Sequence, residues 1–147
     1  MEVAYEDLVR SHVERCLQDI WEAAGGPEID DEGDYPFRTE SCLGWVRLER
    51  QPPMLVRVFA HVAYDVKRSA ALLQELNVLN VRSRLATVCW ADRTVAVHAA
   101  LPVEAVDRAN LRVVLDTVTK VADDISELIA AVFGGRVPLP AHEEAEG

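Results

Sequence analysis

The sequence predicts a single α+β domain in which helices pack on one face of a twisted antiparallel sheet. Apolar residues recur at helical spacing in three segments, and strand-like alternation fills the stretches between them. The chain has 147 residues, of which half are hydrophobic and 27% are charged, a balance typical of one globular domain. The expected order is helix, two or three strands, helix, two strands, helix.

The first two helices are expected before and after the first strands. One covers residues 5–24 and should end at Gly25-Gly26-Pro27, because glycine accepts a left-handed cap and proline cannot continue a helix. The other should begin at Asp65, which we interpret as its N-cap, and end near Asn80. The helical spacing within it comes from leucines at intervals of three and four.

The third helix is expected to be the longest. It should start between residues 107 and 111 and stop at Gly134-Gly135. The following residues, 136–147, contain two prolines and an acidic end without periodic apolar positions. We therefore expect the folded domain to cover residues 1–135 and residues 136–147 to form a disordered acidic tail.

Two hairpins are expected between the helices. Residues 42–50 and 54–64 are rich in valine, leucine and aromatic residues, and Gln51-Pro52-Pro53 is short enough to connect them. Residues 85–90 and 94–101 form the second pair, joined by a three-residue turn.

The charge distribution restricts the classes of partner. Fifteen basic and 25 acidic residues give a net charge of −10, which disfavours nucleic-acid binding. No apolar run reaches the roughly 20 residues that a membrane-spanning helix needs. The acidic segment 28–34 resembles the start of a calcium loop, but its Gly33 is misplaced and Ser41 stands where the bidentate glutamate belongs. We interpret this segment as a solvated, mobile loop.

Neither a cofactor nor an enzymatic activity is expected. The chain contains no phosphate-binding glycine motif, no nucleophile elbow and no zinc-protease motif. Cys16, Cys42 and Cys89 are widely spaced, which indicates reduced thiols and no zinc knuckle. His61, His98 and Cys89 fall in different expected strands, and we interpret them as polar residues of a mixed sheet face and not as metal ligands. The acidic N-terminus lacks an export signal, so a cytoplasmic location is expected.

The sheet face away from the helices is the candidate interaction surface. Alternation predicts that it carries Trp45, Arg47, Arg57, Phe59, His61, Thr87, Cys89 and His98. Large aromatic residues interleaved with arginine are typical anchors of protein interfaces, so we expect a peptide or a second copy of the chain to cover this face. The alternative is that a loop or the acidic segment covers it within the monomer.

One segment carries a family resemblance. Residues 72–80, Leu-Leu-Gln-Glu-Leu-Asn-Val-Leu-Asn, followed by the hairpin through Trp90 and Val95 and by the long last helix, resemble the YbjN-like family. That family is grouped with the bacterial type III secretion chaperones of the CesT and YopN-chaperone kind, the TY-Chap group. The resemblance implies an α-β-β-β-α-β-β-α fold, homodimerisation, a bound peptide segment of a partner protein and no catalytic residues. Its signature positions are Leu76, Asn77, Leu79 and Asn80, which we interpret as architectural, the asparagines capping the last helical turn.

Two hypotheses of function follow. The first is a non-enzymatic chaperone-like or adaptor domain that dimerises and binds a peptide segment. The second is a regulatory protein of the sensory type that binds a small ligand or a signalling partner. A bound helix or strand would favour the first, and a closed pocket with convergent polar groups would favour the second.

Overall fold

The computed structural model describes residues 2–139 and confirms the α+β fold with the order α-β-β-β-α-β-β-α. The elements, in chain order, are α1 (Glu2–Trp21), β1 (Tyr35–Arg38), β2 (Leu43–Glu49), β3 (Leu55–Ala63), α2 (Ala70–Arg82), β4 (Thr87–Ala91), β5 (Thr94–Pro102), a short 3-10 turn (Val103–Ala105) and α3 (Arg108–Phe133).

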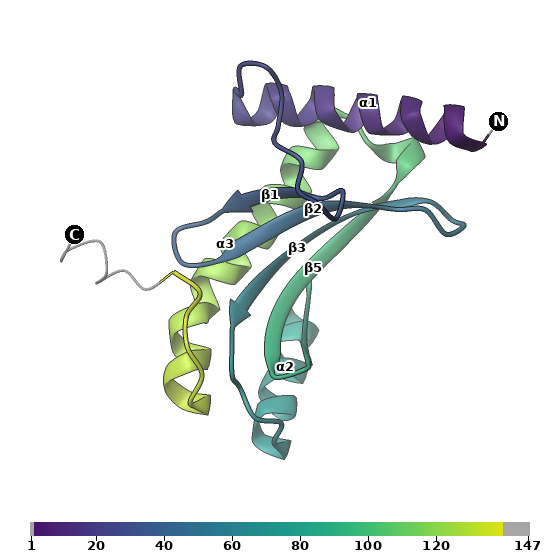
Figure 1. Cartoon of the computed structure of the whole chain (residues 1–147). Coiled ribbons are helices and arrows are strands. Elements are labelled where there is room, and N and C mark those ends of the chain that lie inside the picture. Colours follow the sequence, from purple (N-terminus) through teal and green to yellow (C-terminus); the bar gives the residue numbers. More distant parts are fainter. Residues whose placement is uncertain (1, 140–147) are drawn as a thin grey trace.

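The five strands form one antiparallel sheet in the order β1-β2-β3-β5-β4, so that β3 lies at its centre. Figure 1 shows α1 across one end of the sheet, α2 at the opposite end and α3 running behind the strands. Helix α3 contacts β3 and β5, α1 packs on α3, and α2 packs on β4. The three helices therefore leave the other face of the sheet uncovered.

The core lies between the sheet and α3. Its fully buried side chains come from alternate strand positions such as Val46, Val58 and Val97, and from the apolar stripe of α3, which includes Leu111 and Val118. Removing this apolar surface from water is the main stabilising contribution to folding, at about 25 cal/mol per Å². The face opposite these valines is the one that the sequence predicts to be mixed.

The predicted boundaries of α1 and α2 differ from the structure. Helix α1 ends at Trp21, because Glu22 already adopts a left-handed φ of 52°. The N-cap of α2 is Ser69, whose side chain accepts a hydrogen bond from the Leu72 amide at 3.1 Å. The Asp65 prediction is wrong because that residue also has a left-handed φ, 58°, and lies in the loop before the helix. At α3, Asp107 as N-cap and Gly134 as left-handed C-cap agree with the sequence.

Both edges of the sheet are restricted. On β4, the Asn80 side chain donates to the Val88 carbonyl at 2.9 Å and accepts from the Val88 amide at 2.7 Å. It therefore occupies the backbone groups that an added strand would use. The other edge, β1, is only four residues long and contains Pro36, which has no amide proton to donate.

The residues after α3 do not leave the fold at Gly135 as expected. Residues 136–139, the C-terminal strap, run back along the end of β3: Arg136 and Tyr64 exchange two backbone hydrogen bonds of 2.9 Å, and the Leu139 amide donates to the Ser41 carbonyl at 3.0 Å. The remaining part of the predicted tail, 140–147, lies outside the described residues.

The acidic segment 28–34 is not simply solvated. Asp30 accepts hydrogen bonds from the amides of Glu32 and Asp34, which forms a compact turn. Asp34 is only 3% exposed and pairs with Arg47 on β2 at 2.7 Å. The prediction of a mobile loop is therefore wrong at Asp34, since a distant arginine holds its carboxylate.

Candidate functional site

The uncovered sheet face, called the outer face below, is a grid of cross-strand rows. The longest row runs Pro36, Trp45, Phe59, His98, Thr87 across all five strands. The row on one side contains Leu43, His61, Ala96 and Cys89, and the row on the other contains Arg47, Arg57 and Ala100. The register thus places on one face all eight residues that the sequence analysis assigns to it.

Aromatic rings form a connected cluster on this face. The rings of Trp45 and Phe59 stack with centroids 5.3 Å apart, and the Trp45 and His61 centroids are 4.7 Å apart. His61 meets Tyr64 edge-on and its Nδ1 lies 2.9 Å from the Tyr64 hydroxyl. Side chains of this cluster are half-buried although no helix covers them. The outer face therefore exposes a patch of aromatic surface in a fixed arrangement.

Two arginines flank the aromatic cluster, and each is held by a carboxylate. Arg47 donates from Nε and Nη2 to Asp34 while its guanidinium lies 4.7 Å from the centroid of Phe59. Arg57 donates from Nε and Nη2 to Glu49, and its Nη1 lies 2.9 Å from Nδ1 of His98. These pairs fix the guanidinium planes against the sheet.

The surroundings of both histidines of the outer face lower their pKa and so favour the neutral imidazole. Burial lowers the pKa of His61 below its ordinary value, and the charge of Arg47 lowers it further. Burial and the adjacent Arg57 guanidinium lower the pKa of His98 in the same way. Because an arginine cannot accept a hydrogen bond, Nδ1 of neutral His98 is the acceptor and its Nε2 carries the proton.

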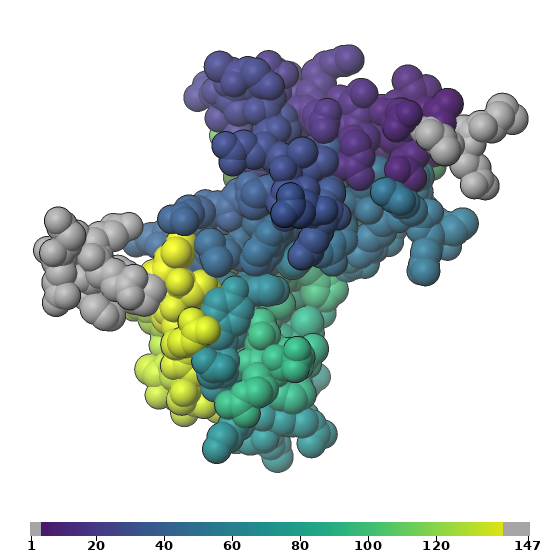
Figure 2. Space-filling model, in the orientation of Figure 1, coloured from purple at the N-terminus to yellow at the C-terminus, as the bar shows by residue number. Residues whose placement is uncertain are grey.

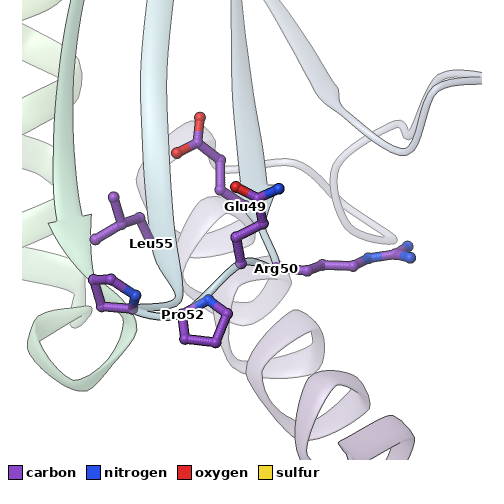
Figure 3. A pocket seen from close by; sticks show the side chains of 6 residues that line it. Glu49, Arg50, Pro52 and Leu55 are labelled. Atoms are coloured by element: carbon purple, nitrogen blue, oxygen red, sulfur yellow. The ribbon is translucent and has the colours of Figure 1, made fainter.

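Shallow hollows lie on this face. One of about 400 Å³ is lined by Arg47, Arg57, Phe59, Ala96 and His98. A second, of about 480 Å³, lies beside the tip of the β2–β3 hairpin, where Glu49 and Leu55 face each other. Figure 3 shows this tip, with Arg50 pointing away from Leu55 towards α1. In Figure 2 the blue surface of the strands lies open between α1 and the yellow C-terminal residues.

Neither a cluster of metal-ligating side chains nor a membrane-spanning helix is found among the residues described. His61 and Cys89 share a row but are separated by β5, and His98 lies in the next row. Within residues 2–139, no three His, Cys, Asp or Glu side chains gather as a metal site would require. No helix in that range is long and apolar enough to cross a bilayer.

The four signature positions of α2 separate into two roles. Leu76 is buried, Leu79 is half-buried against the core, and Asn80 bonds the edge of β4 as described above. Asn80 is thus architectural, but it fastens a strand and does not cap its own helix. Asn77 is exposed.

An apolar groove between α2 and α3 was not predicted. It has a volume of about 210 Å³ and is lined by Glu75, Leu79, Ile125, Leu128, Ile129, Val132 and Phe133. Leu128 and Val132, which line it from α3, are 61% and 62% exposed. In the sequence, Leu128 and Val132 only continue the apolar stripe of the last helix, and the groove could not be predicted because it forms from segments about fifty residues apart.

The fold is that of a type III secretion chaperone. A chain of the crystal structure of the ExsC–ExsE complex superposes with a TM-score of 0.66, at 15% sequence identity, over 81% of this chain and 94% of that chain. No curated protein matches the sequence.

The family follows from the sequence match. Residues 7–141 match the model of the family described as T3SS (YopN, CesT) and YbjN peptide-binding chaperone 1. The chain belongs to this family, which confirms the resemblance seen at residues 72–80.

Proposed function

We propose that this protein is a cytoplasmic, non-enzymatic chaperone that holds a peptide segment of a partner protein on its outer face. Membership of a peptide-binding chaperone family supports this function. A solved structure with the same fold is named as a complex of two proteins, ExsC and ExsE, which is consistent with a protein partner.

The observation that carries the proposal is the aromatic cluster of Trp45, Phe59, His61 and Tyr64. Aromatic side chains with fixed rotamers bind a partner at little cost in conformational entropy, and arginines beside them add hydrogen-bond donors. Antiparallel sheets usually present polar side chains on a face open to solvent. The outer face instead presents stacked rings beside hollows that suit incoming side chains.

Recognition of a small ligand by a regulatory domain is the less supported function. It needs an enclosed pocket in which polar groups converge. The hollows of the outer face are open and shallow, and the α2–α3 groove is almost wholly apolar.

Dimerisation is the second part of the proposal, and we place it at the α2–α3 groove. Copies of a chain with net charge −10 repel one another, so a self-contact is favoured where charge is sparse. The groove lining carries a single charged residue, Glu75. On α2, Glu75 and Arg82 lie seven residues apart, hence on the same side of the helix. In an antiparallel pair of α2 helices centred between Val78 and Leu79, each Glu75 faces Arg82 of the other copy.

The peptide-binding part is tested by selection from a phage library of linear 16-residue peptides on the wild-type protein. Binders should lose at least tenfold in affinity for Trp45→Glu or Trp45→Ala, and retain it for Tyr5→Glu, a matched change at an aromatic residue that is 48% exposed on α1. Circular dichroism and thermal melting report whether each variant is folded. Binders that respond equally to all variants would remove the outer face from the binding site.

The dimer is tested by sedimentation velocity. Val132→Glu should shift the protein towards monomer, because a charge would be buried in the contact. Val113→Glu, at an exposed valine elsewhere on α3, is the control and should not. A wild-type protein that is monomeric at tens of micromolar would refute the dimer.

A further inference from the structure

We infer that the segment bound on the outer face is an amphipathic α-helix that places one carboxylate against Arg47, Arg57 and His98. This inference rests on the proposed function and specifies the chemistry of its partner. Three observations carry it. The backbone hydrogen bonds beside the aromatic cluster are already made within the sheet, the distance between rows of the outer face matches the rise of a helix, and hydrogen-bond donors exceed acceptors beside Phe59.

Around the aromatic cluster the outer face has no free backbone groups to offer an extended peptide. Residues 43–46 of β2, 55–61 of β3 and 95–98 of β5 have a paired strand on both sides, so their amides and carbonyls are used within the sheet. The β4 edge is occupied at Val88 by Asn80. A strand laid across the rings would bury its own polar backbone without partners, whereas an α-helix satisfies its backbone internally.

The row spacing fits a helix. Successive rows of the outer face are two residues apart along a strand, about 6.7 Å. Four residues of α-helix rise about 6.0 Å, so side chains at i and i+4 reach adjacent rows. An apolar residue over Trp45 and Phe59 therefore has its neighbour at i+4 or i−4, depending on the direction of the helix, over Arg47 and Arg57. About nine helical residues span the three rows from His61 to Arg47.

Hydrogen-bond donors exceed acceptors in the hollow beside Phe59. Both carboxylate oxygens of Asp34 already accept from Arg47, and both oxygens of Glu49 accept from Arg57. A guanidinium has five N–H groups, and Nη1 of Arg47 has no acceptor among the described residues.

His98 adds a further donor to the same hollow. Its Nε2–H belongs to a residue of the lining, while its Nδ1 is engaged by Arg57. Donors without acceptors call for an incoming acceptor, and a carboxylate makes the strongest bonds with guanidinium groups.

An incoming lysine is disfavoured on the same ground. The two carboxylates that it would need are each already paired with an arginine, and Asp34 is 5% exposed in its side chain. The net charge of −10 opposes an acidic segment at long range, but this repulsion is screened at physiological salt, where the Debye length is about 8 Å. The contact with the arginines is made at hydrogen-bond distance and is screened much less.

The selected peptides provide the first test. Binders that depend on Trp45 should show apolar residues at intervals of three and four, with Glu or Asp four residues before or after an apolar position, and should gain helical circular dichroism on binding. Alternating apolar residues, or a basic residue at that position, in Trp45-dependent binders would overturn the inference and leave the proposed function standing. The absence of any Trp45-dependent binder would overturn both.

Changes in the peptide provide the second test without altering the protein. Replacing the selected Glu by Gln should weaken binding about three- to tenfold, since a charge-assisted hydrogen bond exceeds a neutral one by about 1 kcal/mol. Replacement by Lys should weaken it more, and replacement of a Glu on the opposite side of the peptide helix should leave affinity unchanged. Equal affinities of the Glu, Gln and Lys peptides in fluorescence anisotropy would refute the carboxylate contact.

Discussion

Single side chains connect elements of this fold that are distant in the sequence. The two signature asparagines, Asn77 and Asn80, show that the contribution of such a side chain to stability depends on its position. Asn80 makes two hydrogen bonds to Val88, whereas Asn77, three residues earlier, is exposed. Asn80→Ala leaves backbone groups of β4 without partners, at an expected cost of about 1–3 kcal/mol in the free energy of unfolding. Asn77→Ala should change it by less than about 0.5 kcal/mol.

Urea denaturation of both asparagine variants and the wild type measures this difference. Equal changes at the two positions would show that the hydrogen bonds of Asn80 to the β4 edge do not contribute to stability.

Asp123 on α3 links the helix to the turn before β2. Its carboxylate accepts from the Thr39 hydroxyl at 2.6 Å and from the Ser41 hydroxyl at 2.8 Å. Burial alone would raise the pKa of Asp123, but these hydrogen bonds and those from the Glu40 and Ser41 amides hold it below its ordinary value. A depressed pKa in the folded state stabilises the protein above the unfolded pKa of about 3.9, and this contribution is lost as pH falls through the folded value.

Asp123→Asn should therefore destabilise the protein at pH 7, and the difference from wild type should shrink as pH falls from 5 towards 3. Urea midpoints across this range measure it. Asp124→Asn, at an exposed neighbour, is the control and should show a much smaller effect at pH 7. A difference for Asp123→Asn that stays constant with pH would contradict the role of its charge.

The contact between strands β1 and β2 includes an aromatic ring, Phe37, that packs over a glycine, Gly44. The Phe37 ring covers Gly44, and a Cβ added there would collide with the ring. Gly44→Ala should cost about 1–3 kcal/mol through overpacking. The same change in a Phe37→Leu background should cost less, because the smaller side chain vacates the space. Denaturant unfolding of the four proteins in this cycle measures the coupling, and additive losses would exclude this contact as the cause.

Local patterns predicted the elements, and long-range contacts account for what they missed. The alternation in β2 and β3 predicted which side chains share the outer face, because side chains alternate strictly along a strand. The stripe of α3 and the glycine after it predicted that helix and its end. At the start of α2, however, Asp65 and Ser69 are both acceptable N-caps, and only the backbone conformation distinguishes them.

The candidate site was predictable only in part for the same reason. Trp45 and Phe59 followed from alternation, but the pairing of Arg47 with Asp34 joins β2 to a loop, and no local pattern encodes it. The bonds between Arg136 and Tyr64 likewise join residues 72 positions apart. The α2–α3 groove depends on how two helices pack, which residue spacing within either helix does not determine.

The whole molecule presents two separate surfaces, which removes the conflict between dimerisation and peptide binding. Helix α3 lies on the face of the sheet opposite Trp45, and the apolar groove lies between α3 and α2. A second copy at the groove therefore leaves the outer face open. One dimer would carry two outer faces, so that a partner with two suitable segments gains affinity through an increased effective concentration.

The net charge predicts how salt affects the proposed dimer. Each copy carries −10, and the repulsion between copies extends over a Debye length of about 20–30 Å at 10–20 mM salt but less than 10 Å at 300 mM. The two proposed Glu75–Arg82 contacts join exposed side chains, which contribute little. The dimer dissociation constant should therefore fall several-fold between 20 and 300 mM NaCl in sedimentation equilibrium. A Glu75→Gln/Arg82→Gln double variant should keep this response. The opposite result would be a wild-type dimer that weakens as salt increases while the dimer of the double variant does not. In that case the ion pairs would supply most of the association free energy, and the apolar groove would not explain the dimer.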